Sequence, residues 1–296
     1  MAPVRVAVAS GKGGTGKTLV ATNLAVHLRR SGRDVTLVDC DVDAPNAAVF
    51  LDVPFVSTPV TVDVPHEPAA GTCPAGCTAC RDACGFGALP LLGGSPVVFA
   101  DLCHHCGLCA RACPLGALTM LPAPVGRVRV GTTREGVRLV VGELTVGLAE
   151  APAVVRAARE RAEATARDVV LLDAPPGTAC AVVATLHDVD LAVLVTDPTV
   201  FGLHDLRLMV ELCRRMAVPA VVVVNRTGTG DADVAGFCRA EGLPVVAHLP
   251  FDRAVAAAYA DGDLVLDRHP DAAEWLSDLW SKAAAHAPAL ASAVPA

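Results

Sequence analysis

Cysteine is the residue type in this chain that can do the most chemistry, and most of the cysteines lie in one segment. Eight of the 12 cysteines lie in the 41-residue segment 73–113, and the other four are scattered singly. A secreted disulfide scaffold can be as dense, but such chains are usually short and carry an export signal. Here the first residues lead directly into a predicted strand, so we expect no signal peptide. The density therefore predicts metal ligation.

The cysteine segment contains one motif twice. The copy over 103–114, C-x2-C-x2-C-x3-C-P, matches the bacterial ferredoxin run residue for residue. The copy over 73–85 has one extra residue after its first cysteine, and Gly85 replaces the proline. In such runs the first three thiolates bind one [4Fe–4S] cluster and the fourth reaches the other cluster. This assigns cluster one to Cys73, Cys77, Cys80 and Cys113, and cluster two to Cys103, Cys106, Cys109 and Cys84.

Zinc is the competing metal for these cysteines. Zinc sites also use C-x2-C pairs, but they typically take two pairs per ion with a longer loop between them. Two tandem runs, each of three cysteines followed by a fourth, favour iron–sulfur clusters. The segment is too small to keep much of a core without its metals, so we expect cluster loss to unfold it.

A second motif is the glycine-rich stretch GKGGTGKT, which fits two templates. Gly11, Gly13 and Gly16 satisfy the dinucleotide fingerprint G-x-G-x-x-G, with an acidic residue near the required distance. The same stretch satisfies the P-loop G-x-x-x-x-G-K-[ST], which we favour because Lys17 and Thr18 suit a triphosphate and Mg²⁺. A dinucleotide needs neither group. The predicted ATP-binding residues are Gly11, Lys12, Gly13, Gly14, Thr15, Gly16, Lys17 and Thr18.

Acidic residues end two of the predicted strands. Asp39 and Asp41 open the segment DCDVDAPN, and Asp173 opens DAPPG. Carboxylates at the C-terminal edge of a parallel sheet point toward the phosphate crevice, where Mg²⁺ requires hard oxygen ligands. We expect Thr18 and Asp39 near the metal.

The loop's second lysine, Lys12, gives KGGTGKT, which resembles the deviant Walker A motif of the MinD/ParA/nitrogenase-iron-protein class of P-loop ATPases. The resemblance implies that Lys12 reaches across a nucleotide-sandwich dimer to the partner's phosphates, while Lys17 binds phosphates within its own subunit. It implies that Asp41 orients the attacking water and that Asp173 belongs to Walker B. Asn225, Arg226, Pro250 and Phe251 resemble the adenine-contacting segments of the class.

Both motifs together resemble MinD-superfamily ATPases with an inserted two-cluster ferredoxin domain, over the chain up to about residue 265. The resemblance implies an ATPase that is slow alone and stimulated by a partner, acting as a homodimer or as a heterodimer with a related ATPase. Because the cysteine segment lies between Asp41 and Asp173, our first hypothesis is that nucleotide-driven closure of the dimer is coupled to electron transfer through the two clusters to an unidentified redox partner. Two alternatives stay open: an iron–sulfur cluster carrier, and a MinD/ParA-type positioning ATPase with a redox-sensing insert.

Hydrophobic periodicity indicates the elements that must position these motifs. Near-continuous apolar runs predict buried strands at 4–10, 34–39, 169–173, 191–196, 220–225 and 245–250, and helical patterns separate most of them. This alternation predicts a doubly wound, mostly parallel α/β sheet. Residues 54–72 are punctuated by prolines and predict a connection. We expect an ATPase domain over 1–55 and 122–296, and a linker plus a small α+β ferredoxin-like domain over 56–121.

Composition limits the remaining possibilities. The net charge is −7, which lacks the positive field of a nucleic-acid or anionic-membrane binder. Hydrophobic residues make up 53% of the chain and charged residues 19%, which is too apolar for disorder. No apolar stretch approaches the length of a membrane span. We expect a cytoplasmic protein with no stable membrane association.

The isolated cysteines and the histidines of the cysteine segment give weaker signals. We interpret Cys180 as a small buried thiol, and Cys213 and Cys238 as core residues. His104 and His105 lie inside the second cysteine motif, where all ligands are already assigned, so we interpret them as spacers.

Overall fold

The computed structural model describes residues 2–287. A nine-stranded sheet runs through the molecule in the order β11-β10-β9-β1-β8-β2-β7-β6-β3. The first seven strands in this order are mutually parallel. Six of them are the apolar runs predicted as buried strands, and β7 is not among those runs. Their bounds are Val245–Pro250 (β11), Ala220–Thr227 (β10), Leu191–Thr196 (β9), Val4–Ser10 (β1), Val169–Pro176 (β8), Val35–Asp39 (β2) and Arg138–Leu144 (β7).

The sheet joins strands from the two ends of the chain. Strands β1 and β2 come from the N-terminal segment, yet β8 lies between them and β7 pairs with the other edge of β2. All of the chain between residues 40 and 137 is therefore inserted between neighbouring strands of one sheet.

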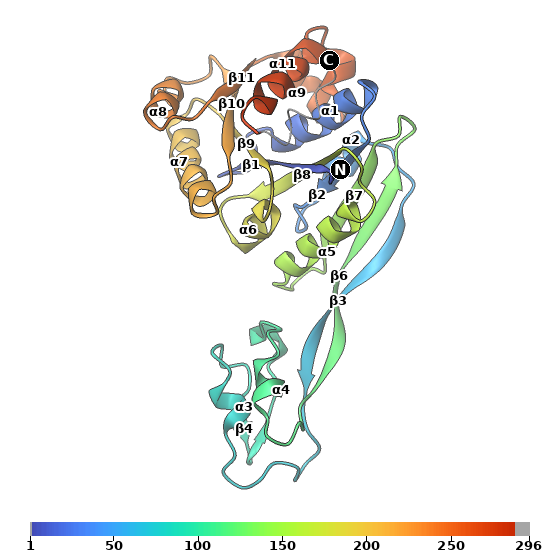
Figure 1. Cartoon of the computed structure of the whole chain (residues 1–296), viewed down its shortest axis with the longest axis vertical. Helices are drawn as coiled ribbons and strands as arrows, with labels where there is room; N and C mark the ends of the chain where they lie inside the picture. Colours follow the sequence, from blue (N-terminus) through green and yellow to red (C-terminus); the bar gives the residue numbers. More distant parts are fainter. Residues whose placement is uncertain (1, 288–296) are drawn as a thin grey trace.

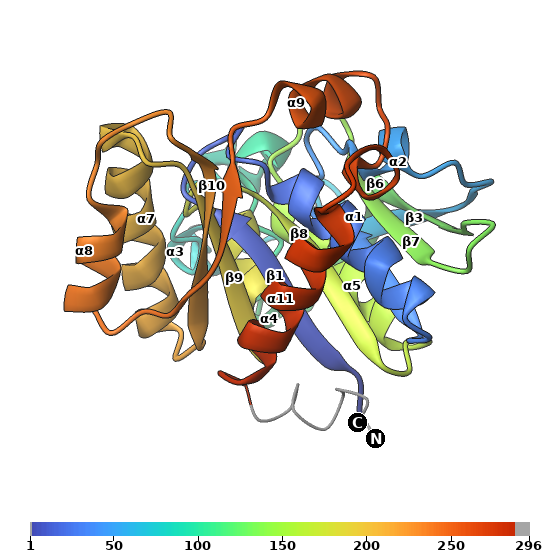
Figure 2. The same ribbon diagram turned by 90° about the horizontal axis from the view of Figure 1, so that it is seen from above.

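Helices cover both faces of the sheet (Figure 2). One face carries α1 (Lys17–Arg30), the short α2 (Ala47–Phe50) and α11 (Ala272–Ala284), and the other carries α5 (Ala151–Glu163), α6 (Cys180–Leu186), α7 (Val200–Arg215) and α8 (Val234–Ala240). Strand β1 shows why both faces are apolar: Val6 and Val8 enter the core under α1, and Ala7 and Ala9 enter the core under α6 and α7. Helices α9 (Arg253–Ala260) and α10 (Val265–Arg268) connect β11 to α11.

The predicted connection over 54–72 is wrong for most of its length. Val56–His66 forms β3, which pairs antiparallel with β6 (Thr119–Thr132), and β6 pairs antiparallel with β7. Pro59 and Pro65 are tolerated because β3 is the last strand of the sheet and its outer edge has no partner strand to receive its N–H groups. The far parts of β3 and β6 leave the body as a two-stranded ribbon (Figure 1).

The ribbon ends in a small unit that we call the cysteine lobe, residues 67–118. It contains α3 (Ala79–Asp82), the two-residue strands β4 (Leu91–Leu92) and β5 (Ser95–Pro96), a 3₁₀ turn (Ala100–Leu102) and α4 (Leu108–Ala112). Its own core is minimal and consists of Cys80, Leu89, Cys109 and Leu118, with partly buried neighbours. The rest of the chain, which we call the body, lies at the other end of the ribbon (Figure 1).

Two smaller expectations can be compared with the structure. Cys213 and Cys238 are buried in the core under α7 and α8, as predicted. Within residues 2–287 no helix has both the length and the apolar character that crossing a membrane requires.

A glycine marks the place where β6 passes beneath α5. A Cβ atom on Gly126 would overlap the Glu143 carbonyl oxygen of β7 and lie 2.9 Å from Cγ2 of Val154 on α5. We predict that Gly126→Ala lowers the free energy of unfolding by about 1–3 kcal/mol, because the strand and helix must separate. Urea titration followed by circular dichroism measures this. Gly85→Ala is the control, since its Cβ would meet open space; equal midpoints for the two variants would contradict the prediction.

Candidate functional site

The loop between β1 and α1 has the geometry of a phosphate cradle. Helix α1 begins at Lys17, and the residue before it, Gly16, has φ 102°, a left-handed conformation that favours glycine. A side chain at Gly16 would also overlap Nδ2 of Asn225. Lys17 and Thr18 are buried at the helix start, where N–H groups and the helix dipole favour an anion.

Asp173 lies directly against this loop. Thr18 Oγ1 donates a 2.6 Å hydrogen bond to Asp173 Oδ2, while Oδ1 is buried and has no partner among the described residues. Burial raises the pKa of Asp173 well above its ordinary value, and the nearby charge of Asp39 raises it further. A buried carboxylate oxygen without a partner, next to a threonine hydroxyl, is the donor set that Mg²⁺ takes. Thr18 and Asp173 therefore fit a magnesium ion, whereas the sequence analysis placed Asp39 with Thr18 near the metal.

Lys17 is the counter-charge of the acidic group. Burial lowers the pKa of Lys17, and the carboxylates of Asp173 and Asp41 act in the opposite direction. Burial also raises the pKa of Asp41, against the attraction of Lys17. Lys17 thus faces several carboxylates, so a divalent cation bound here would balance their negative charge.

Asp39 has a different local role from Asp173, although the two are register partners on adjacent strands. Its Oδ1 accepts from the backbone N–H of Asp41 at 3.1 Å, and its Oδ2 accepts from Asn46 and Ala47 at 2.9 Å each. Burial raises the pKa of Asp39 to about 6 despite these bonds. These three hydrogen bonds show that Asp39 fixes the conformation of the segment that carries Asp41.

Lys12 is bound within its own chain in this structure. Its Nζ lies 2.9 Å from Asp197 Oδ2 and 3.5 Å from Thr199 Oγ1, at the end of β9. Burial would raise the pKa of Asp197, but hydrogen bonds from Thr199 and Lys12 outweigh it and lower that pKa. Sequence reasoning assigned no role to Asp197 or Thr199; the only signal was their position after a buried strand.

The predicted adenine-contacting residues lie together beside the P-loop. Asn225, Arg226, Pro250 and Phe251 line a cavity of about 480 Å³ that Gly14 and Gly16 also line. Asn225 Nδ2 donates a 2.7 Å hydrogen bond to the Thr15 carbonyl, which ties the end of β10 to the loop. Sequence reasoning missed three other lining residues, Thr199, Thr229 and Tyr259.

In the cysteine lobe the structure brings the first predicted ligand set together. Cys73, Cys77, Cys80 and Cys113 line one small cavity with apolar neighbours, although Cys113 comes from the second motif. Cys103 and Cys106 lie close enough to Cys109 for their charges to raise the pKa of its thiol, after the larger effect of burial.

Four cysteines around one cavity are a donor set that an iron–sulfur cluster can take. Among the described residues no group of three or more His, Cys, Asp or Glu side chains converges on a position for one metal ion. The thiolates of a [4Fe–4S] cluster each bind a different iron atom and are therefore spread around a larger object. A cavity lined by four cysteines suits such an object.

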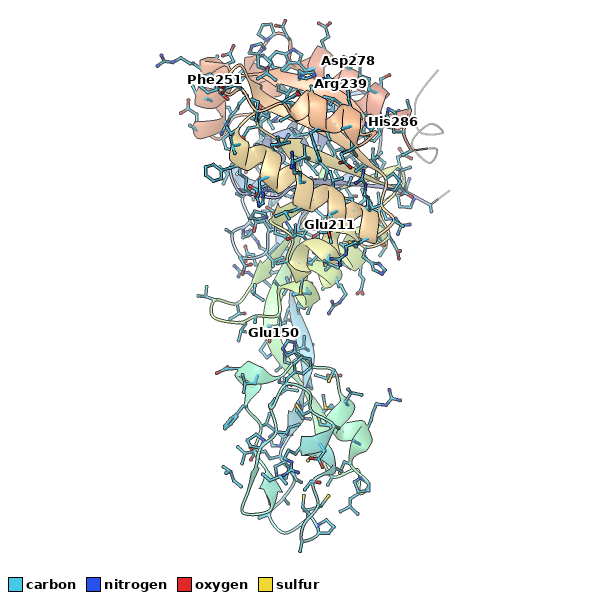
Figure 3. The ribbon with its side chains drawn as sticks, turned by 90° about the vertical axis from the view of Figure 1, so that its left-hand side faces the viewer. Glu150, Glu211, Arg239, Phe251, Asp278 and His286 are labelled. Atoms are coloured by element: carbon cyan, nitrogen blue, oxygen red, sulfur yellow. The ribbon has the colours of Figure 1, made fainter. Side chains whose placement is uncertain are left out.

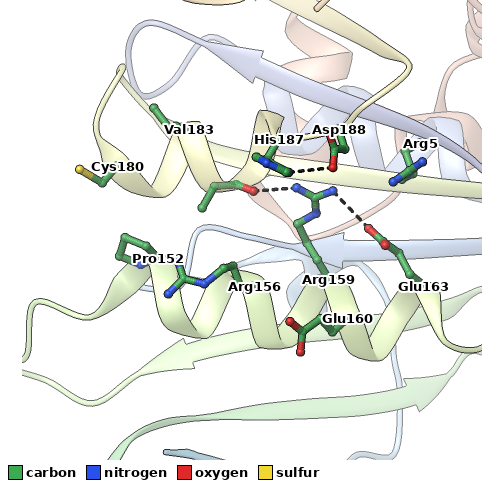
Figure 4. A pocket seen from close by; sticks show the side chains of 11 residues that line it. Arg5, Pro152, Arg156, Arg159, Glu160, Glu163, Cys180, Val183, His187 and Asp188 are labelled. Atoms are coloured by element: carbon green, nitrogen blue, oxygen red, sulfur yellow. Dashed lines mark hydrogen bonds and ion pairs between the residues drawn. The ribbon is translucent and has the colours of Figure 1, made fainter. Parts of the chain in front are cut away.

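Two expectations about single residues were wrong. Cys180 is exposed at the start of α6, and its sulfur points away from the body (Figure 4). The reason is that helix α6 begins there, and the core contacts are made by Val182 and Leu186. His105 is more than a spacer, because its Nε2 lies 2.9 Å from Glu150 Oε1, a residue of the body that sequence reasoning missed.

Comparison with known proteins agrees with this geometry. Residues 6–265 match the model of the CobQ/CobB/MinD/ParA nucleotide binding domain. An uncharacterized protein of Methanocaldococcus jannaschii is 28% identical over 279 residues, which is 94% of this chain and 96% of that protein. An iron-sulfur cluster carrier protein of Aquifex aeolicus is 25% identical over 284 residues, which is 90% of this chain and 62% of the carrier.

A solved structure shows the same fold. The septum site-determining protein MinD from Pyrococcus horikoshii, solved with Mg-ADP, superposes with a TM-score of 0.56 at 18% identity, over 94% of each chain. At that identity the likeness concerns the fold alone. The family match covers most of the sequence, and it includes the P-loop and both acidic strand ends. The chain therefore belongs to the CobQ/CobB/MinD/ParA family of nucleotide-binding domains.

Proposed function

We propose that this protein is an ATPase that couples nucleotide binding to electron transfer through two [4Fe–4S] clusters in the cysteine lobe. The observation that carries the proposal is that a cavity lined by four cysteines and a P-loop with a buried, unpartnered carboxylate oxygen occur in one chain. Relatives named as iron-sulfur cluster carriers support the iron–sulfur part.

At the nucleotide end each residue has a definable role. Lys17 and the loop N–H groups bind the phosphates, Thr18 and Asp173 hold Mg²⁺, and Asp41 orients the attacking water. Asp39 holds the segment of Asp41 in place through three backbone hydrogen bonds. Asn225 and Phe251 bind the adenine in the 480 Å³ cavity.

Dimerisation completes this site. Lys12 would exchange its intrachain partner Asp197 for the phosphates bound by a second subunit, either an identical chain or a related ATPase. Val200 and Phe201 support such an interface, because both are about three-quarters exposed (77% and 76%) and follow directly after Thr199, a contact of Lys12. Large apolar side chains exposed beside a charged site are typical of surfaces that become buried.

In the cysteine lobe the chain supplies the thiolates and a few apolar neighbours. Cys113 is prepared as a thiolate ligand, because the Ala117 N–H lies 3.3 Å from its sulfur and this hydrogen bond lowers the pKa of the thiol. Apolar side chains such as Leu89 and Leu118 pack against the cysteines. Bound clusters would supply one-electron transfer between an external reduced donor and an external acceptor.

A second candidate function is that of a cluster carrier, which delivers a cluster to another protein. The names of several relatives favour it. Against it, the chain has no C-x2-C pair outside the cysteine lobe. Transfer of iron and sulfide from the purified protein to an apo-ferredoxin would support the carrier, and retention of the clusters through many reduction cycles would support electron transfer.

The coupling itself is tested by stopped-flow reduction. Anaerobically purified protein, its clusters reduced with dithionite and the excess dithionite removed, is mixed with a one-electron acceptor dye, with and without MgATP. We expect the reduction rate of the dye to change several-fold when the segments that carry Asp41 and Asp173 respond to nucleotide. MgADP and ATP without Mg²⁺ are the controls. Identical rates under all conditions would refute the coupling.

The magnesium assignment predicts that removing the charge of Asp173 raises the stability of the nucleotide-free protein and lowers its activity. Asp173→Asn removes a buried charge but keeps an oxygen that can accept from Thr18. Because the pKa of Asp173 is raised in the folded chain, its ionisation costs stability as the pH rises above the ordinary carboxyl range. The nucleotide-free variant should therefore unfold at a higher temperature than the wild type at pH 7, with the gain disappearing toward pH 4.

The same variant should lose function. ATP hydrolysis should fall by a factor of about 100 or more, and the Mg²⁺-dependent part of the stabilisation by ATP should disappear. Differential scanning calorimetry and phosphate release measure the two effects. Asp278→Asn, at an exposed position on α11, is the matched control. A variant less stable than the wild type at pH 7 would contradict the assignment.

The crossed ligand sets predict which cluster each cysteine holds. Cys113→Ser should lower the iron content from about eight to about four atoms per chain and leave one reduced cluster signal in electron paramagnetic resonance. Cys84→Ser should lower it equally but leave the other signal. Cys73→Ser, in the same crossed set as Cys113, should leave the same signal as Cys113→Ser. Different signals remaining in Cys73→Ser and Cys113→Ser would show that each motif binds its own cluster. Zinc without acid-labile sulfide would refute the clusters altogether.

A further inference from the structure

The cysteine lobe touches the body at one polar contact. Among the described residues, His105 with Glu150 is the hydrogen bond recorded between residues 67–118 and the rest of the chain. His105 lies between Cys103 and Cys106, inside the second cysteine motif. Glu150 precedes α5 and lies where the ribbon leaves the body (Figure 3). The cysteine lobe and the body are otherwise joined by the ribbon.

The contact has the features of a built interaction. The two side chains are only 15% and 14% exposed, so water competes weakly for their 2.9 Å hydrogen bond. The carboxylate has no proton to give, so Nε2 of the ring donates. The second oxygen of Glu150 accepts from the Ala149 N–H at 3.0 Å, which fixes the carboxylate.

The backbone of His105 indicates that the contact holds it in place. Its φ is 53°, a left-handed conformation that costs a non-glycine residue energy unless its surroundings impose it. The neighbouring His104 stacks on Phe86 with ring centroids 3.7 Å apart, which anchors the loop on the cysteine-lobe side. One histidine therefore fastens the loop to the cysteine lobe, and the other fastens it to the body.

From Glu150 a continuous set of contacts leads to the nucleotide site. Glu150 caps α5, and Arg159 of α5 donates from Nη1 to the carbonyls of Ala184 and Thr185 at 2.7 and 3.3 Å (Figure 4). Those carbonyls belong to α6, which follows the segment after Asp173. Arg159 is 7% exposed, so this bridge between the two helices is itself buried.

We propose that the His105–Glu150 hydrogen bond is a latch that fixes the cysteine lobe on the body and connects the second cysteine motif, through α5 and α6, to the segment after Asp173. Glu150 is thereby a positioning residue for the electron-transfer unit. The connection rests on the proposed function, whereas the latch rests only on the contacts of this chain.

Hydrogen exchange of the full chain with its clusters tests the latch. Glu150→Ala should speed amide exchange in residues 103–107 about tenfold, because the loop loses its hydrogen bond to the body. Glu150→Gln should have a smaller effect, since its amide oxygen still accepts from His105. Glu160→Ala, on the same helix without a recorded ion pair, is the matched control and should match the wild type. Exchange in Glu150→Ala equal to that of the control would overturn the latch.

The connection is tested in the same experiment by adding MgATP. In the wild type we expect MgATP to change exchange both in residues 174–187 and in residues 103–107, and in Glu150→Ala only in the former. Arg159→Lys removes the guanidinium group that bonds the carbonyls of Ala184 and Thr185. This variant should keep the latch but lose the effect of MgATP on residues 103–107. A wild-type loop that ignores MgATP would overturn the connection.

These results remain distinguishable from a failure of the proposed function. That failure would appear as missing iron and sulfide, or as reduction of the acceptor dye at a rate independent of nucleotide. A dye reduction rate that is independent of nucleotide leaves the comparison between Glu150→Ala and Glu160→Ala unchanged. That comparison is made on chains whose iron and sulfide contents have first been measured as equal. Small-angle scattering gives an independent readout, because the latch variant should have a larger radius of gyration than the control.

Discussion

The structure depends on a group of carboxylates held at the carboxyl ends of β2 and β8 with too little positive charge to balance them. Asp39 and Asp173 are almost fully buried, and their pKa values are raised mainly because water is excluded. Lys17 is the cation nearest to them, and burial lowers its own pKa. Such a cluster is costly in the empty protein, and a divalent cation with a triphosphate removes much of that cost. In the proposed function, the nucleotide and its cation would therefore bind at the position where the two strands end.

The sheet explains why these residues can meet at all. Asp39 and Asp173 are far apart in sequence but are register partners, because β8 inserts between β1 and β2. The same arrangement makes room for the cysteine lobe. The chain leaves the sheet after β2 and returns through the antiparallel pair β3 and β6, so the insertion extends the sheet at one edge without breaking its parallel centre.

Much of this could be predicted from the sequence, because the main signals are local. Most strands of the parallel centre are apolar runs, and the P-loop and the cysteine motifs are recognised by fixed spacings over a few residues. Strand β3 could not be recognised, since its prolines are acceptable only at a sheet edge and nothing in the sequence shows where the edge lies. Cys180 was misjudged because free cysteine is usually buried. The contact of His105 with Glu150 joins residues 45 positions apart, and it depends on how the ribbon orients the cysteine lobe.

The position of the ribbon limits how the two ends of the molecule can communicate. Strands β6 and β3 are the outermost pair, and β8, β2 and β7 separate them from β1 and the P-loop. A change at the P-loop would have to pass across the whole width of a rigid, hydrogen-bonded sheet to reach the cysteine lobe through the ribbon. Helix α5 offers a shorter route, because it packs on β6 and β7 and also on α6, directly after the segment that follows Asp173. A helix can shift slightly over a sheet without breaking backbone hydrogen bonds. A shift of α5 would therefore reach the cysteines through Glu150, the residue directly before the helix.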